Sequence, residues 1–328
     1  MSAAPSLSPS LSLSLAPSAP LAGPAPGRVD ADGPGAPHVL DDGGEGQGAA
    51  RRVLFTADDF GWTDGHNLAI ERAAQAGTLC RASLLANGAA FAGALETARR
   101  VPRLGVGVHL SLCEGRPLSG RAPGLAPLLR PDGALYDGLG PLVRAYATRR
   151  LDVAAVRAEW RCQIERALSA GLALTHLDGH KHVHLLPPLI ALAIELAREY
   201  GVPYVRVPGE ALSLQAALGR AAGWLVLSSL ARRARAAVRG AGLATCDHFV
   251  GFVRSGAMTR EHLLRAVRGA RPGLTEIMVH PALRTPQFQS VLGGYAWARS
   301  YRSEEEAAAL CDEELRRALR LGPPAPTR

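Results

Sequence analysis

The sequence predicts an α/β fold, an irregular (β/α) barrel with about seven parallel strands. From residue 52 onward, short apolar runs rich in β-branched residues alternate with segments of helical composition. This repeated order of strand and helix favours parallel strands joined by crossover helices. About seven such units over roughly 270 residues are close to the usual size of a (β/α) barrel, whose active site lies at the carboxyl ends of its strands.

The elements follow from composition and periodicity. The predicted strands cover residues 53–56, 82–86, 105–108, 172–177, 204–207, 248–253 and 276–279. The predicted helices cover residues 65–76, 90–100, 153–170, 188–200, 213–239, 259–270 and 303–321. Residues 117–136 break this rhythm with Gly and Pro every few positions. We expect them to form a long loop over one face, as a rim for a substrate.

Three segments differ in composition. Residues 1–50 consist mainly of Ser, Ala, Pro, Gly and Leu, which cannot bury enough apolar surface to offset the entropy of ordering, so we expect a disordered extension. Its alternating Ser-Leu run at residues 10–16 follows no basic residue and is not a solid apolar core, which disfavours a secretion signal. Residues 51–321 form the predicted barrel domain, and residues 322–328 a disordered tail.

The composition excludes several classes of protein. The net charge of +8 comes almost entirely from arginine, since Lys181 is the single lysine, and aromatic residues make up only 5% of the chain. Base-stacking platforms are therefore scarce, and we expect no nucleic-acid partner. No apolar run reaches the ~18 residues of a membrane span. The five cysteines are scattered without a Cys-x-x-Cys pair, which favours reduced thiols in a cytoplasmic enzyme.

The predicted helix at residues 213–239 is amphipathic and ends in a cluster of arginines. One interpretation is peripheral contact with the inner face of a membrane. The alternative, which we favour, is an ordinary barrel helix with a solvated arginine face.

Polar residues follow four of the predicted strands. Asp58 and Asp59 come after the first strand, His109 after the third, a histidine-rich segment from Asp178 to His184 after the fourth, and His280 after the last. Because parallel strands all end at the same face, these residues are expected to converge.

These residue types favour a catalytic metal. Neighbouring carboxylates are costly to hold together without a cation. Imidazoles combined with a carboxylate leave coordination positions open, activate water, and leave a second carboxylate free as general base. The structural alternatives are a helix-capping role for the Asp pair, a hydrogen-bonded structural histidine at His109, and a His280 that simply ends a strand before Pro281. Four histidines within nine positions, beside Asp178, favour metal or catalytic use: His176, His180, His182 and His184.

Five motifs in register resemble the YdjC-like carbohydrate deacetylases over about residues 52–281. They are Thr-Ala-Asp-Asp-Phe-Gly at 56–61, Asn-Gly at 87–88, Gly-Val-His-Leu at 107–110, Thr-His-Leu-Asp-Gly-His-Lys-His-Val-His at 175–184 and His-Pro-Ala at 280–282. The resemblance implies an irregular (β/α) barrel that hydrolyses the acetamide of an N-acetylated sugar.

The resemblance also implies roles for individual residues. One divalent ion would be held by Asp59, His109 and His180, with Asp58 as the base. We further infer that His280 is the acid that protonates the leaving amine. Two imidazole ligands favour Zn²⁺ on ligand softness, whereas the family implies Mg²⁺.

The segment Asp-Gly-His-Lys-His-Val-His at residues 178–184 departs from the Asp-Ser-His-His-His-Val-His of the chitooligosaccharide branch. It resembles the branch associated with hopanoid biosynthesis, which implies an N-acetylglucosaminyl hopanoid headgroup as a lipid-linked substrate. Lys181 would then lie at the rim of the site.

Other residues have expected supporting roles. Asp178, His182 and His184 are candidates for orienting the ligand imidazoles. Arg206 is expected either to contact sugar hydroxyls or to form a structural salt bridge. A homodimer is a further expectation. The alternative functions are a chitooligosaccharide-type deacetylase, a metal-dependent phosphoesterase and a non-catalytic barrel that binds sugar or lipid.

Overall fold

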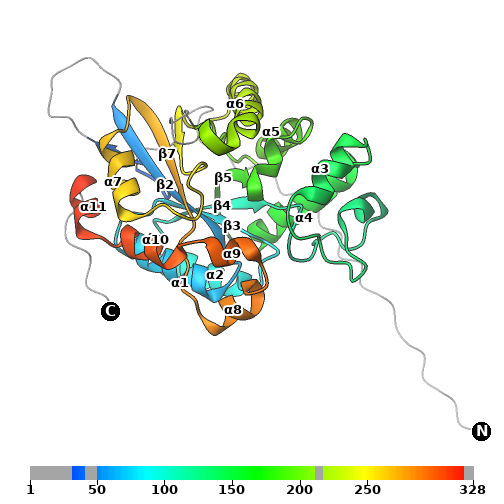
Figure 1. Cartoon of the computed structure of the whole chain (residues 1–328), viewed down its shortest axis with the longest axis horizontal. Coiled ribbons are helices and arrows are strands. Elements are labelled where there is room, and N and C mark those ends of the chain that lie inside the picture. The colour runs from blue at the N-terminus through cyan, green and yellow to red at the C-terminus, as the bar shows by residue number, and fades with distance from the viewer. Residues whose placement is uncertain (1–31, 41–49, 211–216, 321–328) are drawn as a thin grey trace, which may run out of the picture.

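Strands and helices alternate along the chain in the computed structural model, which describes residues 32–40, 50–210 and 217–320 (Figure 1). Within these residues the strands are β1 (His38–Leu40), β2 (Arg51–Phe60), β3 (Arg81–Leu84), β4 (Gly105–Leu110), β5 (Leu174–Gly179), β6 (His248–Val250) and β7 (Gly273–Val279).

Helices separate most of these strands. The longer ones are α1 (Asp64–Gln75), α2 (Phe91–Arg100), α3 (Gly140–Ala147), α4 (Val153–Ser169), α5 (Leu189–Glu199), α6 (Ala217–Gly240), α7 (Arg260–Arg268) and α10 (Ser303–Leu310). Shorter helices are η1 (Pro123–Leu128), η2 (His180–Leu185), α8 (Pro286–Leu292), α9 (Ala296–Ser300) and α11 (Glu313–Ala318).

The strands form one sheet in the order β5-β4-β3-β2-β7-β6, all parallel, and β1 is added to β2 antiparallel. Residues 204–210 link its two edges, because they make isolated parallel bridges to Leu177 of β5 and to Phe249 of β6. These bridges fit the irregular barrel that the sequence predicts. The predicted strand at 204–207 makes single bridges rather than a ladder, and the flanking Pro203 and Pro208 have no N–H to donate.

The core surrounds the central strand β2, which is buried from residue 53 to residue 60. A strand that is buried on both faces reads as a nearly continuous apolar run, and the parallel sheet explains that run here. Helix α1 packs on β2, α4 on β4, and α5 on β5 and η2. Because the strands are parallel, every loop that leaves a carboxyl end opens onto one face.

The structure adds local elements to the prediction. The rim segment 117–136 contains η1, and α3, α8 and α9 were not predicted. The predicted helix at 303–321 is two helices, because the carboxylate of Asp312 accepts the N–H groups of Glu314 and Leu315 and so starts α11. Predicted disorder at 1–31, 41–49 and 322–328 lies outside the described residues.

Disorder was also predicted for residues 32–40, and there the prediction is wrong. His38–Leu40 form β1 on the edge of β2, and Leu40 is buried. The carbonyl of Gly35 accepts a hydrogen bond of 3.0 Å from Nε of the buried Arg81, and His38 Nε2 donates to the carbonyl of Thr78 at 2.9 Å. The low hydrophobicity of residues 1–50 as a whole predicted disorder, although the short stretch at residues 32–40 is stabilised by contacts with distant residues.

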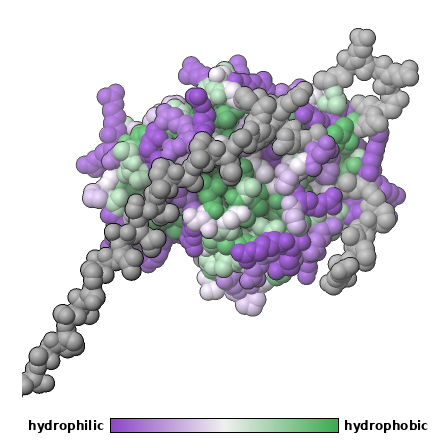
Figure 2. Space-filling model, turned by 180° about the vertical axis from the view of Figure 1, so that it is seen from behind, coloured by the Kyte–Doolittle hydropathy of each residue, from purple (hydrophilic) through white to green (hydrophobic). Residues whose placement is uncertain are grey.

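Much of the surface arginine is paired with carboxylates. Such pairs include Arg100–Glu71, Arg161–Glu199 and Arg260–Asp312. On the face seen in Figure 2, hydrophilic side chains lie along the periphery and hydrophobic ones reach the surface nearer the centre. Among the described residues, no helix combines the length and the apolarity needed to cross a membrane.

Removing β1 should destabilise the barrel. A variant lacking residues 1–40 loses the burial of Leu40 and leaves Nε of Arg81 without its acceptor. We expect its free energy of unfolding to fall by about 2–4 kcal/mol relative to a variant lacking only residues 1–31. Urea unfolding of both variants measures the difference, and coincident transitions would contradict the structural role of β1.

Candidate active site

The end of β2 brings two consecutive carboxylates to the same face. Neighbouring residues of a regular strand point to opposite faces. Here the β2–β3 register shifts between Ala57 and Phe60, and Asp59 has a φ of 67° in the left-handed region. Asp58 and Asp59 therefore both border the same group of histidines, within 4 Å of His109 Nε2. A strained non-glycine residue of this kind costs about 1–3 kcal/mol and is typical of functional sites.

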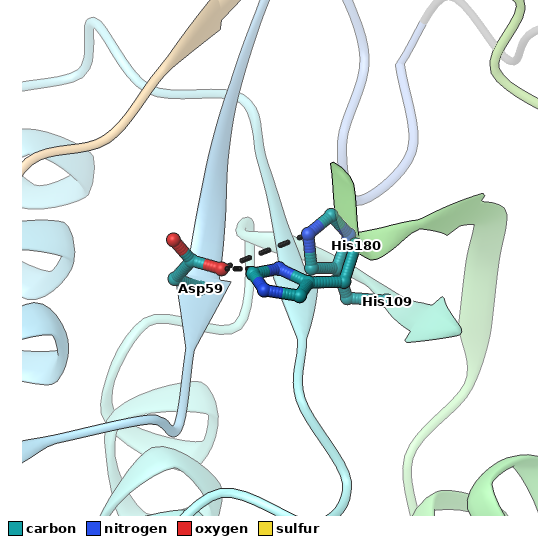
Figure 3. Close-up of side chains that lie close together, drawn as sticks. All are labelled: Asp59, His109 and His180. Atoms are coloured by element: carbon teal, nitrogen blue, oxygen red, sulfur yellow. Dashed lines mark ion pairs between the residues drawn. The ribbon is translucent and has the colours of Figure 1, made fainter. Parts of the chain in front are cut away.

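The three predicted ligands converge at this point (Figure 3). Asp59 Oδ1 lies 3.1 Å from His180 Nδ1 and 3.7 Å from His109 Nε2, and all three side chains are buried. Atoms that each lie ~2.1 Å from one ion stand roughly 3.0–3.5 Å apart, depending on the coordination geometry. The group, whose candidate ligand atoms all lie within 4.8 Å of one another, therefore has dimensions that could hold a metal ion.

The chemistry of the donors fits a cation as well. Asp59 Oδ1 is buried and accepts no hydrogen bond from any described residue, although it faces two imidazoles. His109 Nδ1 donates to Asp178 Oδ1 at 2.7 Å, and His180 Nε2 donates to Glu114 Oε2 at 2.8 Å. Each carboxylate fixes the proton on the far nitrogen of its histidine. The nitrogens that remain, Nε2 of His109 and Nδ1 of His180, are those that face Asp59.

A second group of possible ligands shares His109 but has its own positive charge. Asp58, His109 and Asp178 also lie close enough together to hold an ion. Nη1 of Arg206, however, lies 2.8 Å from Asp58 Oδ1 and 2.7 Å from Asp178 Oδ2. The guanidinium compensates these two carboxylates, so the group around Asp59 is the better cation site.

The charges in the site shift several pKa values. Burial works to lower the pKa of His180, but Asp59 and Glu114 outweigh it and raise the pKa to about 9. Burial works to raise the pKa of Asp59, but His180 and His109 hold it far below its usual range. Burial raises the pKa of Asp58, and the neighbouring Arg206 only partly opposes this. Metal-free protein at neutral pH therefore carries a protonated His180 between two carboxylates.

His280 lies beside this group, on the same face. Its Nε2 is 4.0 Å from Asp58 Oδ2, and its ring packs against Tyr301 at a centroid distance of 5.2 Å. The backbone N–H of His280 donates to the buried Glu306 on α10, which anchors the end of β7. The Nδ1 atom has no hydrogen-bond partner among the described residues. The structure thus places His280 next to Asp58.

Arg206 lies deeper than a residue that contacts sugar would. It is fully buried, and besides Asp58 and Asp178 its Nε donates to Glu276 Oε1 at 2.9 Å. Of the two expected roles, this placement matches the structural salt bridge and not contact with sugar hydroxyls.

The other predicted supporting residues divide in two. Asp178 contacts His109, and Lys181 pairs with Glu114 at the rim. His184 Nε2 donates to the backbone carbonyl of Arg206 at 2.8 Å. It therefore holds the backbone of the arginine that pairs with Asp58 and Asp178. The His182 ring lies against Phe249 and Phe252. No hydrogen bond or ion pair joins it to the candidate ligands in the described part of the chain.

Sequence reasoning missed several residues of the site. Glu114 follows β4 by four positions, directly before Gly115, and an acidic residue in a loop after a strand end was the available signal. Ser83, whose hydroxyl donates to Asp178 at 2.6 Å, and Glu276 lie within strands and carried no such signal. An aromatic wall also borders the site, formed by Trp62, Tyr295, Trp297 and Tyr301.

Comparisons with known proteins agree with these motifs. The model of the family described as YdjC-like protein matches residues 52–321. A human carbohydrate deacetylase is 36% identical over 249 residues, which cover 70% of this chain and 74% of the human protein. A carbohydrate deacetylase from Brevibacillus brevis is 32% identical over 254 residues, 77% of this chain and 89% of that protein.

One solved structure has a similar fold. It is that of a proposed cellobiose-phosphate cleavage protein from Enterococcus faecalis, with a TM-score of 0.61 and 24% identity. The match covers 82% of this chain and 93% of that one.

Removing the buried guanidinium should cost far more stability than removing an exposed one. Arg206→Met leaves three buried carboxylates without their cation, and we expect a loss of about 3–5 kcal/mol in the free energy of unfolding. The matched control is Arg302→Met, which breaks the exposed pair with Glu305 and should cost roughly 0–1 kcal/mol. Equal losses in denaturant unfolding would contradict the assigned role of Arg206.

Proposed function

This chain belongs to the YdjC-like protein family, and we propose that it is a metal-dependent hydrolase that removes the acetyl group from an N-acetylated sugar. The observation that carries the proposal is the convergence of Asp59 Oδ1, His109 Nε2 and His180 Nδ1 at the carboxyl ends of three strands. The relatives described as carbohydrate deacetylases support a sugar substrate and hydrolysis of an acetyl group.

Asp59, His109 and His180 would hold one divalent ion. When bound there, such an ion supplies an electrophile for the acetyl carbonyl and lowers the pKa of a water. The unsatisfied oxygen of Asp59 supports this assignment, and so do the two histidines, each of which has one nitrogen held by a carboxylate and the other facing Asp59. Two imidazoles favour Zn²⁺ on ligand softness, and Mg²⁺ is the alternative.

Asp58 and His280 would move the protons. Hydrolysis forms a bond between the acetyl carbon and a water oxygen, breaks the amide C–N bond, and sends a proton to the leaving amine. Asp58 would accept a proton from the attacking water, and burial raises its pKa toward the range useful for a base. The imidazole of His280, 4.0 Å from Asp58, would donate the proton that the amine needs.

As the exact substrate we propose an N-acetylglucosaminyl hopanoid headgroup. The motif at residues 178–184, with Lys181 at the rim, supports this choice. A cytoplasmic location and a homodimer belong to the same proposal. For α6 the ordinary barrel helix with a solvated arginine face stays the favoured interpretation, and contact with the inner face of a membrane is the alternative. In α6, Arg232 and Arg233 are exposed.

Acetate release tests the reaction and the substrate together. Metal-replete protein is incubated with an N-acetylglucosaminyl hopanoid, with chitobiose and with a phosphate monoester. Acetate and phosphate are then measured. Acetate from the hopanoid alone supports the proposal in full, and acetate from chitobiose alone favours the chitooligosaccharide alternative. Phosphate release favours the phosphoesterase, and binding without turnover favours the non-catalytic barrel.

Two variants should separate metal binding from catalysis. Asp58→Asn keeps one of the two acceptors for Arg206 but loses the base, so we expect one bound ion and a turnover lowered by at least about a hundredfold. His180→Ala should lose both the ion and activity. Metal analysis measures the bound ion, and acetate release measures turnover. Loss of the ion in Asp58→Asn, or full activity in His180→Ala, would contradict the assigned roles.

Metal uptake should depend on pH. His180 has a pKa of about 9 in the metal-free protein, so below this pH an ion must displace its proton. We expect the association constant to rise roughly tenfold per pH unit up to about pH 9, with release of one proton per ion from His180. Calorimetry in buffers of different ionisation enthalpy measures the released proton. Uptake without proton release below pH 9 would contradict this assignment.

A further inference from the structure

A single buried carboxylate, that of Glu114, joins the candidate metal site to its rim. Its Oε2 accepts from His180 Nε2 at 2.8 Å. Its Oε1 accepts from Nζ of Lys181 and, at 3.2 Å, from Nε1 of Trp297. Only 3% of Glu114 is exposed, so these three donors replace the water that a carboxylate would otherwise bind.

The backbone of Glu114 is strained, and hydrogen bonds hold it in this conformation. Its φ is 65°, in the left-handed region that glutamate rarely adopts, and the strain is of the order of 1–2 kcal/mol. The N–H of Glu114 donates to the carbonyl of Tyr136, and its own carbonyl accepts from Nδ2 of Asn87. Strain of this kind persists where the surrounding structure determines the conformation, as it does at functional sites.

The neighbours of Glu114 contact His180 by a second path. The Trp297 ring stacks on Trp62 at 5.1 Å, and Trp62 meets the His180 ring edge-on at 5.1 Å. Lys181 Nζ lies 5.5 Å from the centre of the Trp297 ring. The imidazole is therefore held in its plane by an indole and at one nitrogen by Glu114.

We propose that Glu114 is a positioning residue, which directs Nδ1 of His180 toward Asp59 and ties Lys181 and Trp297 to the rim of the same site. This inference rests on the proposed function, because a cation at Asp59, His109 and His180 is what gives the orientation of His180 its use. A carboxylate can only accept from Nε2, so a proton stays there, and Nδ1 is the nitrogen that binds an ion once it has given up its own proton. Asp178 has the same relation to His109.

The test is the affinity of metal-free protein for Zn²⁺, measured by chelator competition. Glu114→Gln keeps an acceptor for His180 but not the charge, and Glu114→Ala keeps neither. We expect Zn²⁺ affinity to fall about 10–100-fold in Glu114→Ala, with Glu114→Gln between it and the parent. Zn²⁺ affinity in Glu114→Ala equal to that of the parent would overturn the inference.

Glu159 offers a matched control. It is as deeply buried, and it accepts from the N–H groups of Leu118 and Ser119 and from Gln163. Glu159→Gln should lower thermal stability and leave Zn²⁺ affinity within about threefold of the parent. If it weakens Zn²⁺ binding as much as Glu114→Gln does, general loosening explains both, and the inference fails.

These experiments distinguish a failure of the proposed function from a failure of this inference. Parent protein that binds no divalent ion would overturn the proposed metal dependence and this inference together. Parent protein that binds Zn²⁺ and releases acetate, beside a Glu114→Ala variant with undiminished affinity, would overturn this inference alone. Lys181→Met separates the two ends of the carboxylate. A loss of affinity as large as that in Glu114→Gln would mean that the lysine, and not the bond to His180, carries the effect.

Discussion

The site depends on the balance of charge around one buried guanidinium. Arg206 lies among the carboxylates of Asp58, Asp178 and Glu276, all of which are buried. Like charges this close raise one another's pKa unless a cation compensates them. With Arg206 in place, Asp178 stays ionised and holds Nδ1 of His109, while Asp58 keeps a fixed orientation. Asp59 is outside this network, so its charge is balanced by His180 or by a metal.

The backbone geometry at the end of β2 gives the two neighbouring aspartates different surroundings. A regular strand would direct Asp58 and Asp59 to opposite faces. The register shift and the left-handed backbone at Asp59 place one carboxylate beside Arg206 and the other beside two histidines. Two carboxylates behind those histidines, Asp178 and Glu114, hold the far nitrogens, so that Nε2 of His109 and Nδ1 of His180 face Asp59. Binding of an ion and movement of protons can therefore be assigned to different members of the pair.

The sequence predicted the parts of this arrangement that have a period or a motif. Alternating strands and helices predicted the α/β fold with its parallel sheet, and polar residues at strand ends predicted the positions of Asp58, Asp59, His109, His180 and His280. The sequence could not predict the features that depend on contacts between residues far apart in the chain. β1 is stabilised by Arg81, Trp297 reaches Glu114 across 183 positions, and residues 204–207 pair only in single bridges between two prolines. Composition also left the role of Arg206 open, because a buried arginine and a substrate-binding one look the same in a sequence.

The position of the ion tests the central claim most directly. Crystals grown with Zn²⁺ and measured at the zinc absorption edge would locate it by anomalous scattering. The account predicts one peak, bonded at about 2.0–2.2 Å to Asp59 Oδ1, His109 Nε2 and His180 Nδ1. A peak between Asp58 and Asp178 that displaces Arg206, or no peak near these strand ends, would contradict it.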